Sequence, residues 1–288
     1  MPANLGAILT AMVTPFDAEG RLDEEATVRL VHHLVEHGSD GLVVCGTTGE
    51  AATLNDEEHL RVIELAVQEM KGRCTIVAGV GSNDTRHAVH LTERATALGP
   101  DALLSVNPYY NRPSRRGIIR HYQEVVRATD LPILLYNIPQ RTAQDLPNDL
   151  LAELAQLENI VGVKQANPQN LARIDGLEIY AGNDDMLADV LDLGEPGGVL
   201  TSSHFFGGEL RRMVDEPDQR RQIEDELRDA WEALGVAPLA CSIKAGLAIL
   251  GISAGVPRLP YVELDAQERE TVRAMLERHG LLQEATAR

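Results

Sequence analysis

The sequence predicts an α/β fold, a (β/α)8 TIM barrel with extra C-terminal helices, on the basis of three observations. The chain has 288 residues, a length typical of such a barrel. Short apolar runs alternate eight times with longer amphipathic stretches, in units of about 25 to 35 residues. The runs are apolar throughout instead of alternating with polar residues, which is typical of parallel strands buried on both faces.

The expected strands are short runs rich in β-branched and other apolar residues. In chain order they are Ala7–Met12, Gly41–Cys45, Thr75–Gly79, Ala102–Val106, Ile133–Tyr136, Ile160–Lys164, Glu178–Tyr180 and Gly198–Thr201. The main alternative is an open doubly wound sheet. No G-x-G-x-x-G follows the first strand, so the dinucleotide-binding version of that fold is disfavoured.

Amphipathic segments between the strands predict helices, among them Asp23–Glu36, Asp56–Glu69, Thr85–Ala97 and Arg116–Ala128. Asn55 and Glu58 have the spacing of a capping box at the start of the second helix. After the eighth strand the pattern predicts helices only, at Glu209–Val214, Asp218–Leu234, Ser242–Leu250 and Asp265–His279. We therefore expect residues 1–204 to contain the barrel through its eighth strand. Residues 205–288 are expected to form a helical extension packed on the barrel as one structural unit.

The composition excludes several classes of protein. The chain carries 44 acidic and 26 basic residues, a formal net charge of −18, so phosphates would be repelled and nucleic-acid binding is disfavoured. No run of eighteen apolar residues occurs, so no membrane span is expected. The first residues lack a basic region followed by a long apolar region. We therefore expect a cytoplasmic protein.

The cysteines and histidines do not form metal-binding patterns. Cys45, Cys74 and Cys241 are an odd number of widely spaced thiols without a C-x-x-C, which indicates reduced packing residues. The nine histidines form no H-x-H or H-E-x-x-H at the end of a strand. A metal-dependent barrel lyase is therefore disfavoured.

The segment after the second expected strand is Gly46–Glu50, with the sequence G-T-T-G-E. In an α/β barrel the working residues lie at the C-terminal ends of the strands and in the loops that follow. Two hydroxyls between glycines, together with backbone N–H groups, are able to bind a carboxylate. The alternative is an ordinary turn with a capping threonine, and this motif alone does not decide between the two.

Tyrosines follow the fourth and fifth expected strands. Tyr109 and Tyr110 are adjacent in a chain with only 3% aromatic residues, although such a pair is more often a packing feature than a catalytic one. Tyr136 ends the fifth strand, where a phenol is able to relay a proton. Arg141 follows closely, and its guanidinium is suited to bidentate binding of a carboxylate.

Lys164 ends the sixth expected strand, in the sequence V-G-V-K. A lysine at this position points into the barrel mouth, where burial disfavours the ammonium form and lowers the pKa. The resulting free amine is able to attack a carbonyl carbon. The alternative is a lysine that extends to the rim of the barrel. Four unusual segments at strand ends together favour the catalytic interpretation.

These segments resemble one known family over nearly the whole chain. They match the pyruvate-dependent class I lyases of the dihydrodipicolinate synthase and N-acetylneuraminate lyase type, in order and spacing. The matching motifs are T-P-F at Thr14–Phe16, G-T-T-G-E at Gly46–Glu50, P-Y-Y-N-R-P at Pro108–Pro113, Y-N-I-P at Tyr136–Pro139 and the G-V-K strand ending at Lys164.

The resemblance implies a reaction and its substrates. Lys164 would condense with pyruvate, and the resulting enamine would attack L-aspartate 4-semialdehyde, a step of lysine and diaminopimelate biosynthesis. Arg141, in Y-N-x-P-x-R-T, would bind the carboxylate of the semialdehyde. The alternative is an aldolase for 2-keto-3-deoxy sugar acids or N-acetylneuraminate that uses the same Schiff base, and Arg141 argues against it. A non-catalytic family member is a further alternative, which the intact set of motif residues disfavours.

The resemblance also implies roles for the neighbouring residues. Tyr136, Thr47 and Tyr110 would form a proton relay, with Tyr110 reaching the active site of a partner subunit. A homo-oligomer is therefore implied, with a dimer of dimers as the expected form. Thr48 would bind the pyruvate carboxylate. Backbone groups near Gly182 and Leu200 would line the pocket. No cofactor and no metal is implied, because the lysine imine is itself the electron sink.

The sequence departs from the family pattern at three places. The glycine that usually follows Arg-Thr is Ala143. Gln165-Ala166-Asn167 follows the lysine, where the family often has an acidic residue and then small hydroxyls. Gly182-Asn183-Asp184 stands where G-D-D is common. None of these changes removes a group to which the resemblance assigns a catalytic role.

Overall fold

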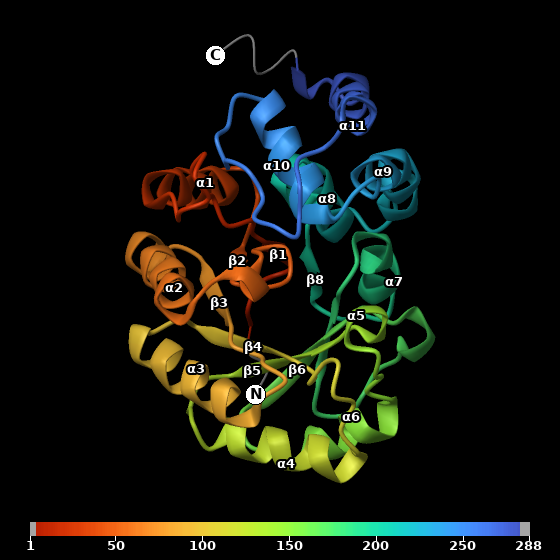
Figure 1. Ribbon diagram of the computed structural model, residues 1–288. Helices are drawn as coiled ribbons and strands as arrows, with labels where there is room; N and C mark the ends of the chain where they lie inside the picture. Colours follow the sequence, from red (N-terminus) through yellow and green to blue (C-terminus); the bar gives the residue numbers. More distant parts are fainter. Residues whose placement is uncertain (1–3, 283–288) are drawn as a thin grey trace.

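The computed structural model describes residues 4–282 and contains a closed barrel of eight parallel strands (Figure 1). The strands pair in sequence order, and β8 closes on β1. The barrel fold is therefore confirmed, and the open sheet is wrong. The strands are β1 (Ile8–Ala11), β2 (Gly41–Val44), β3 (Thr75–Gly79), β4 (Ala102–Val106), β5 (Ile133–Asn137), β6 (Ile160–Gln165), β7 (Glu178–Ala181) and β8 (Gly197–Leu200).

Helices surround the barrel, and the first four begin at residues whose side chains cap them. Asn55 and Glu58 form the expected capping box of α2, and Asp23, Asp84 and Ser114 cap α1, α3 and α4. The helices of the barrel are α1 (Glu24–Glu36), α2 (Asp56–Met70), α3 (Thr85–Leu98), α4 (Arg115–Val126), α5 (Pro139–Thr142), α6 (Asn148–Leu154), α7 (Leu187–Asp192) and α8 (Ser203–Asp215).

The spacing of helices is less regular in the second half of the barrel. Between β6 and β7 the described chain contains only the 3-10 helix η2 (Pro168–Asn170), and η3 (Asp184–Met186) precedes α7. The long amphipathic helices of the first half therefore give way to short turns around β6 and β7.

Two apolar layers form the core. The interior of the barrel is filled by side chains from the strands, including Leu9, Val77, Leu134 and Val199. A larger layer lies between the strands and the surrounding helices. Burial on both faces explains why the strand sequences are apolar throughout. Cys45 and Cys241 are buried and unpaired, in agreement with the predicted packing role, and burial raises the pKa of the Cys45 thiol.

The C-terminal helices are α9 (Arg220–Leu234), α10 (Leu239–Ile249) and α11 (Ala266–Arg278), which lie together beside α8 in Figure 1. Helix α8 begins at Ser203, earlier than the expected Glu209, and it packs against both β1 and α9. It therefore runs across the proposed division at residues 204 and 205, and that division stays a prediction.

No single helix among residues 4–282 is long and apolar enough to cross a membrane. Helices α9 and α10 meet the length and composition criteria only when taken as a pair, and the pair is bent by 103°.

Candidate active site

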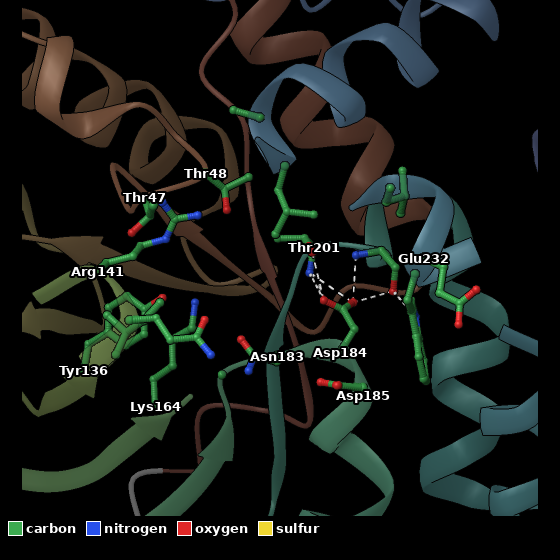
Figure 2. Close-up of a pocket in the computed structure, with 18 of the residues that line it drawn as sticks. Thr47, Thr48, Tyr136, Arg141, Lys164, Asn183, Asp184, Asp185, Thr201 and Glu232 are labelled. Atoms are coloured by element: carbon green, nitrogen blue, oxygen red, sulfur yellow. Dashed lines mark hydrogen bonds between the residues drawn. The ribbon is translucent and has the colours of Figure 1, made fainter. Parts of the chain in front are cut away.

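A cavity of about 440 Å³ opens at the C-terminal ends of the strands (Figure 2). This volume is typical of a site for a small molecule. Six residues expected at the site line it, and they come from four strand ends that are distant in sequence. They are Thr47, Thr48, Tyr136, Arg141, Lys164 and Gly182.

Lys164 is the central cationic group of this cavity. Its side chain ends β6 and is 6% exposed, and its Nζ lies 4.4 Å from the centroid of the Tyr136 ring. The two residues are register partners on β5 and β6, which explains their proximity. Burial lowers the pKa of Lys164 from 10.5 to about 8, Asp184 opposes this shift, and Arg141 adds to it. This direction agrees with the loss of basicity expected from the sequence, which stays a prediction.

This lowered pKa predicts the pH dependence of covalent capture by the amine. With a pKa of about 8, about a tenth of Lys164 is free amine at pH 7, against roughly 1 in 3,000 for an unperturbed lysine. The rate of imine formation with pyruvate should rise with pH and level off above about pH 8. Stopped-flow measurement of imine formation from pH 6 to 10 tests this. A rate of imine formation that rises with a midpoint near pH 10.5 would contradict this prediction.

Tyr136 is buried beside Lys164 at the end of β5. Burial raises the pKa of its phenol to about 12, while the nearby Arg141 and Thr47 side chains oppose that rise. The phenol is therefore protonated at neutral pH. The Thr47 hydroxyl lines the same cavity, so two groups that exchange protons readily lie beside an amine that must gain and lose them.

Arg141 lies on α5, the short helix after β5, and is more exposed than Lys164. Its positive charge lowers the pKa values of both Lys164 and Tyr136. The helix ends at Ala143, which has a φ of 58° in the left-handed region that favours glycine. Alanine at this family glycine position therefore retains the glycine-like backbone, and Thr142 Oγ1 secures the turn by donating to Gln144 O at 2.7 Å.

Asp184 organises the opposite wall of the cavity (Figure 2). Its carboxylate accepts from Thr201 Oγ1 at 2.8 Å, from Ser202 N at 2.8 Å and from the Ser202 hydroxyl. The Trp231 indole Nε1 in turn donates to Ser202 Oγ at 3.2 Å. The loop after β7, the loop after β8 and helix α9 are thus joined at one wall.

Sequence reasoning missed most of this wall. The G-N-D-D sequence after β7 is a local signal that could have identified Asp184 and Asp185. No local signal marks Arg228, Trp231 or Glu232, which reach the cavity from α9. Trp231 is the only tryptophan of the chain, so its fluorescence is a direct reporter of occupancy of the cavity.

Two expected site residues lie outside the cavity lining. Leu200 is fully buried at the end of β8, and the next residue, Thr201, lines the cavity. Tyr110 is 88% exposed, with a φ of 71°. The roles expected for these two residues stay predictions. A second cavity, also of about 440 Å³, shares Thr47 and Tyr136 with the first and continues between α2 and α3.

The family model described as the dihydrodipicolinate synthetase family matches residues 4–279. The chain belongs to this family. It is 39% identical to the 4-hydroxy-tetrahydrodipicolinate synthase of Desulforudis audaxviator, over 98% of this chain and 100% of that protein.

Solved structures of family members superpose on the whole fold. The dihydrodipicolinate synthase of Cyanidioschyzon merolae with lysine bound is 35% identical, with a TM-score of 0.94, over 98% of this chain and 100% of that chain. The chloride-inhibited dihydrodipicolinate synthase of Acinetobacter baumannii complexed with pyruvate is 32% identical, with a TM-score of 0.90, over 96% of this chain and 99% of that chain. Family membership and fold thus agree with the resemblance seen in the sequence.

Proposed function

We propose that this protein is a 4-hydroxy-tetrahydrodipicolinate synthase that condenses pyruvate with L-aspartate 4-semialdehyde through a Schiff base on Lys164. The observation that carries the proposal is the buried Lys164 amine, of lowered pKa, in one cavity with Tyr136, Thr47 and Arg141. The reaction belongs to lysine and diaminopimelate biosynthesis, which we expect in the cytoplasm.

The first half of the proposed reaction forms the imine. The neutral amine of Lys164 attacks the C2 carbonyl of pyruvate, and the carbinolamine loses water to give a protonated imine. Thr48 and nearby backbone groups bind the pyruvate carboxylate. The Tyr136 and Thr47 hydroxyls move the protons that the carbonyl oxygen gains and the nitrogen loses, a role supported by their place in one cavity with Lys164.

The second half forms the carbon–carbon bond. Loss of a proton from the pyruvate methyl group converts the imine to an enamine, whose terminal carbon attacks the aldehyde carbon of the semialdehyde. Arg141 binds the carboxylate of this second substrate. The amino group of the semialdehyde then displaces Lys164 by transimination, which closes the ring and restores the free amine. The protonated imine nitrogen accepts the electron pair left when the methyl proton departs, and it returns that pair when the enamine attacks, so the reaction needs no metal or organic cofactor.

The alternative reaction class is the cleavage of 2-keto-3-deoxy sugar acids or N-acetylneuraminate. The cationic Arg141 at the cavity favours a second substrate that carries a carboxylate close to its aldehyde. Turnover of pyruvate with L-aspartate 4-semialdehyde should therefore be measured with a coupled reductase that consumes the cyclic product, in parallel with sugar-acid cleavage. Efficient cleavage without synthase turnover would assign the protein to the aldolase class.

We further propose that the protein is a homo-oligomer, a dimer of dimers, in which Tyr110 completes the proton relay of a neighbouring subunit. The proposal is supported by the 88% exposure of the Tyr110 side chain and by its absence from the cavity lining of its own chain. Such a tyrosine contributes to a site only if another copy of the chain approaches it.

A complementation experiment tests this arrangement. The variant Tyr110→Phe should have low activity, since loss of a proton-relay group costs on the order of 10²-fold. Lys164→Ala should also have low activity, since it lacks the nucleophile. Hybrid oligomers made by co-expression should regain activity, because one subunit supplies Lys164 and the other supplies Tyr110. Failure of the isolated hybrids to regain activity, or full activity of a monomer in sedimentation experiments, would contradict the shared site.

A further inference from the structure

A buried ion pair joins the C-terminal helices to the G-T-T-G-E loop. Lys244 on α10 donates from Nζ to Glu50 Oε1 at 2.6 Å, and the two side chains are 1% and 0% exposed. Glu50 is the last residue of the loop that carries Thr47 and Thr48, whereas Lys244 lies 194 residues further along the chain. Neither residue lines the cavity at Lys164.

The environment of the pair fixes both charged groups. Lys244 Nζ also donates to Val256 O at 3.0 Å and lies 4.2 Å from the centroid of the Phe16 ring. The backbone N–H of Arg258 donates to the other oxygen, Glu50 Oε2, at 2.8 Å, and its guanidinium lies 4.0 Å from the same ring. Both carboxylate oxygens of Glu50 are therefore bound by residues of the C-terminal segment.

The T-P-F segment also binds the same loop directly. Thr14 Oγ1 donates to Gly49 O at 2.7 Å. A Cβ added at Gly49 would lie only 3.2 Å from Thr14 Oγ1 and 3.1 Å from Met12 O, so a side chain there would require these neighbours to move by a few tenths of an ångström. The T-P-F segment thus binds Gly49 and the C-terminal segment binds Glu50, and these are the two residues that follow the threonines.

The backbone carries this restraint to the catalytic threonines. Glu50 has a φ of 53°, a left-handed conformation that is uncommon for a residue with a side chain. Its N–H donates to Thr47 O at 3.1 Å and closes the turn. A shift of the Glu50 side chain therefore moves the turn that places the Thr47 and Thr48 hydroxyls.

A buried ion pair is weak evidence of added stability, because the cost of desolvating two charges offsets their attraction. The pair is nevertheless held in one geometry. Each buried charged group has lost its water and depends on its hydrogen bonds within the protein. We infer that Glu50 and Lys244 are positioning residues, which fix the loop of Thr47 and Thr48 and make the C-terminal helices necessary for catalysis. This inference rests on the proposed function.

The test is the double variant Glu50→Gln/Lys244→Met, which removes both charges and leaves no unpaired buried ion. Ile118→Ala on α4 is the matched control, because it creates a cavity in the core at the end of the molecule opposite α10 (Figure 1). Phe16→Leu is a milder variant that removes the ring under Lys244 and keeps the site apolar. Melting temperature, kcat and KM for pyruvate are measured for each full-length protein.

The double variant should stay folded with kcat reduced about 10-fold or more and a raised KM for pyruvate, because small displacements of catalytic groups are costly. Ile118→Ala should lower the melting temperature and leave kcat unchanged, and Phe16→Leu should reduce kcat several-fold. Wild-type kcat and KM in the folded double variant would overturn the inference. If that variant does not fold, unchanged kcat in Phe16→Leu overturns it. Absence of synthase turnover in the wild type would instead refute the proposed function.

Discussion

Replacement of Lys164 by alanine is expected to abolish covalent capture of pyruvate and to lower kcat by about 10³-fold or more. The reason is that no other described amine faces the cavity. The chain has only three lysines, Lys71, Lys164 and Lys244, and the last is bound to Glu50 away from the cavity. Incubation with pyruvate and borohydride, followed by peptide mass mapping, should locate one reduced adduct on Lys164.

Two further variants test whether the free amine is required in addition to the charge, and whether it must be the amine of Lys164. Lys164→Arg retains a positive charge, but a guanidinium stays protonated and cannot attack a carbonyl, so it should be as inactive as alanine. Lys71→Ala should react and turn over as the wild type does. A borohydride-stable adduct elsewhere in Lys164→Ala, or turnover by Lys164→Arg, would be inconsistent with the proposed mechanism.

Replacement of Arg141 by alanine is expected to reduce kcat/KM for L-aspartate 4-semialdehyde by about 10²-fold, equal to about 2.7 kcal/mol. The second substrate loses the partner of its carboxylate, while the Lys164 amine is retained. Borohydride trapping of pyruvate should therefore continue. Because the charge of Arg141 helps to lower the pKa of Lys164, the rise of imine formation with pH should also move to higher pH.

Arg141→Lys separates these two effects. It keeps a positive charge, so the pH dependence of imine formation should stay near that of the wild type. It loses the bidentate geometry, so KM for the semialdehyde should remain raised. If Arg141→Ala used the semialdehyde as efficiently as the wild type does, the assignment of the second substrate would fail.

The barrel was predictable because each strand signal is local. Buried parallel strands are read from short apolar runs, and the observed β3 and β4 have the predicted bounds. Tyr136 and Lys164 were predictable site residues for a related reason. Parallel strands in a closed barrel all end at the same rim. Residues at the strand ends therefore lie close together, independently of how the surrounding side chains pack.

Other features depended on information that is not local. The helices around β6 and β7 are short, so the regular βα period did not give their bounds. Helix α9 reads as an ordinary amphipathic helix, and nothing in its sequence shows that Trp231 lines the cavity. That placement depends on the bond from the indole to Ser202 and on the packing of α9 against α7 and α8.

The sequence by itself therefore determined the barrel, the family and the residues at the strand ends, because chain direction and strand order bring those residues together. Only the tertiary structure decided the wall formed by Asp184, Ser202 and Trp231, and the pairing of Glu50 with Lys244. These contacts join segments far apart in the chain, and many side chains must pack at once to bring them within hydrogen-bond distance. No hydrophobic periodicity and no short motif in the sequence predicts these contacts.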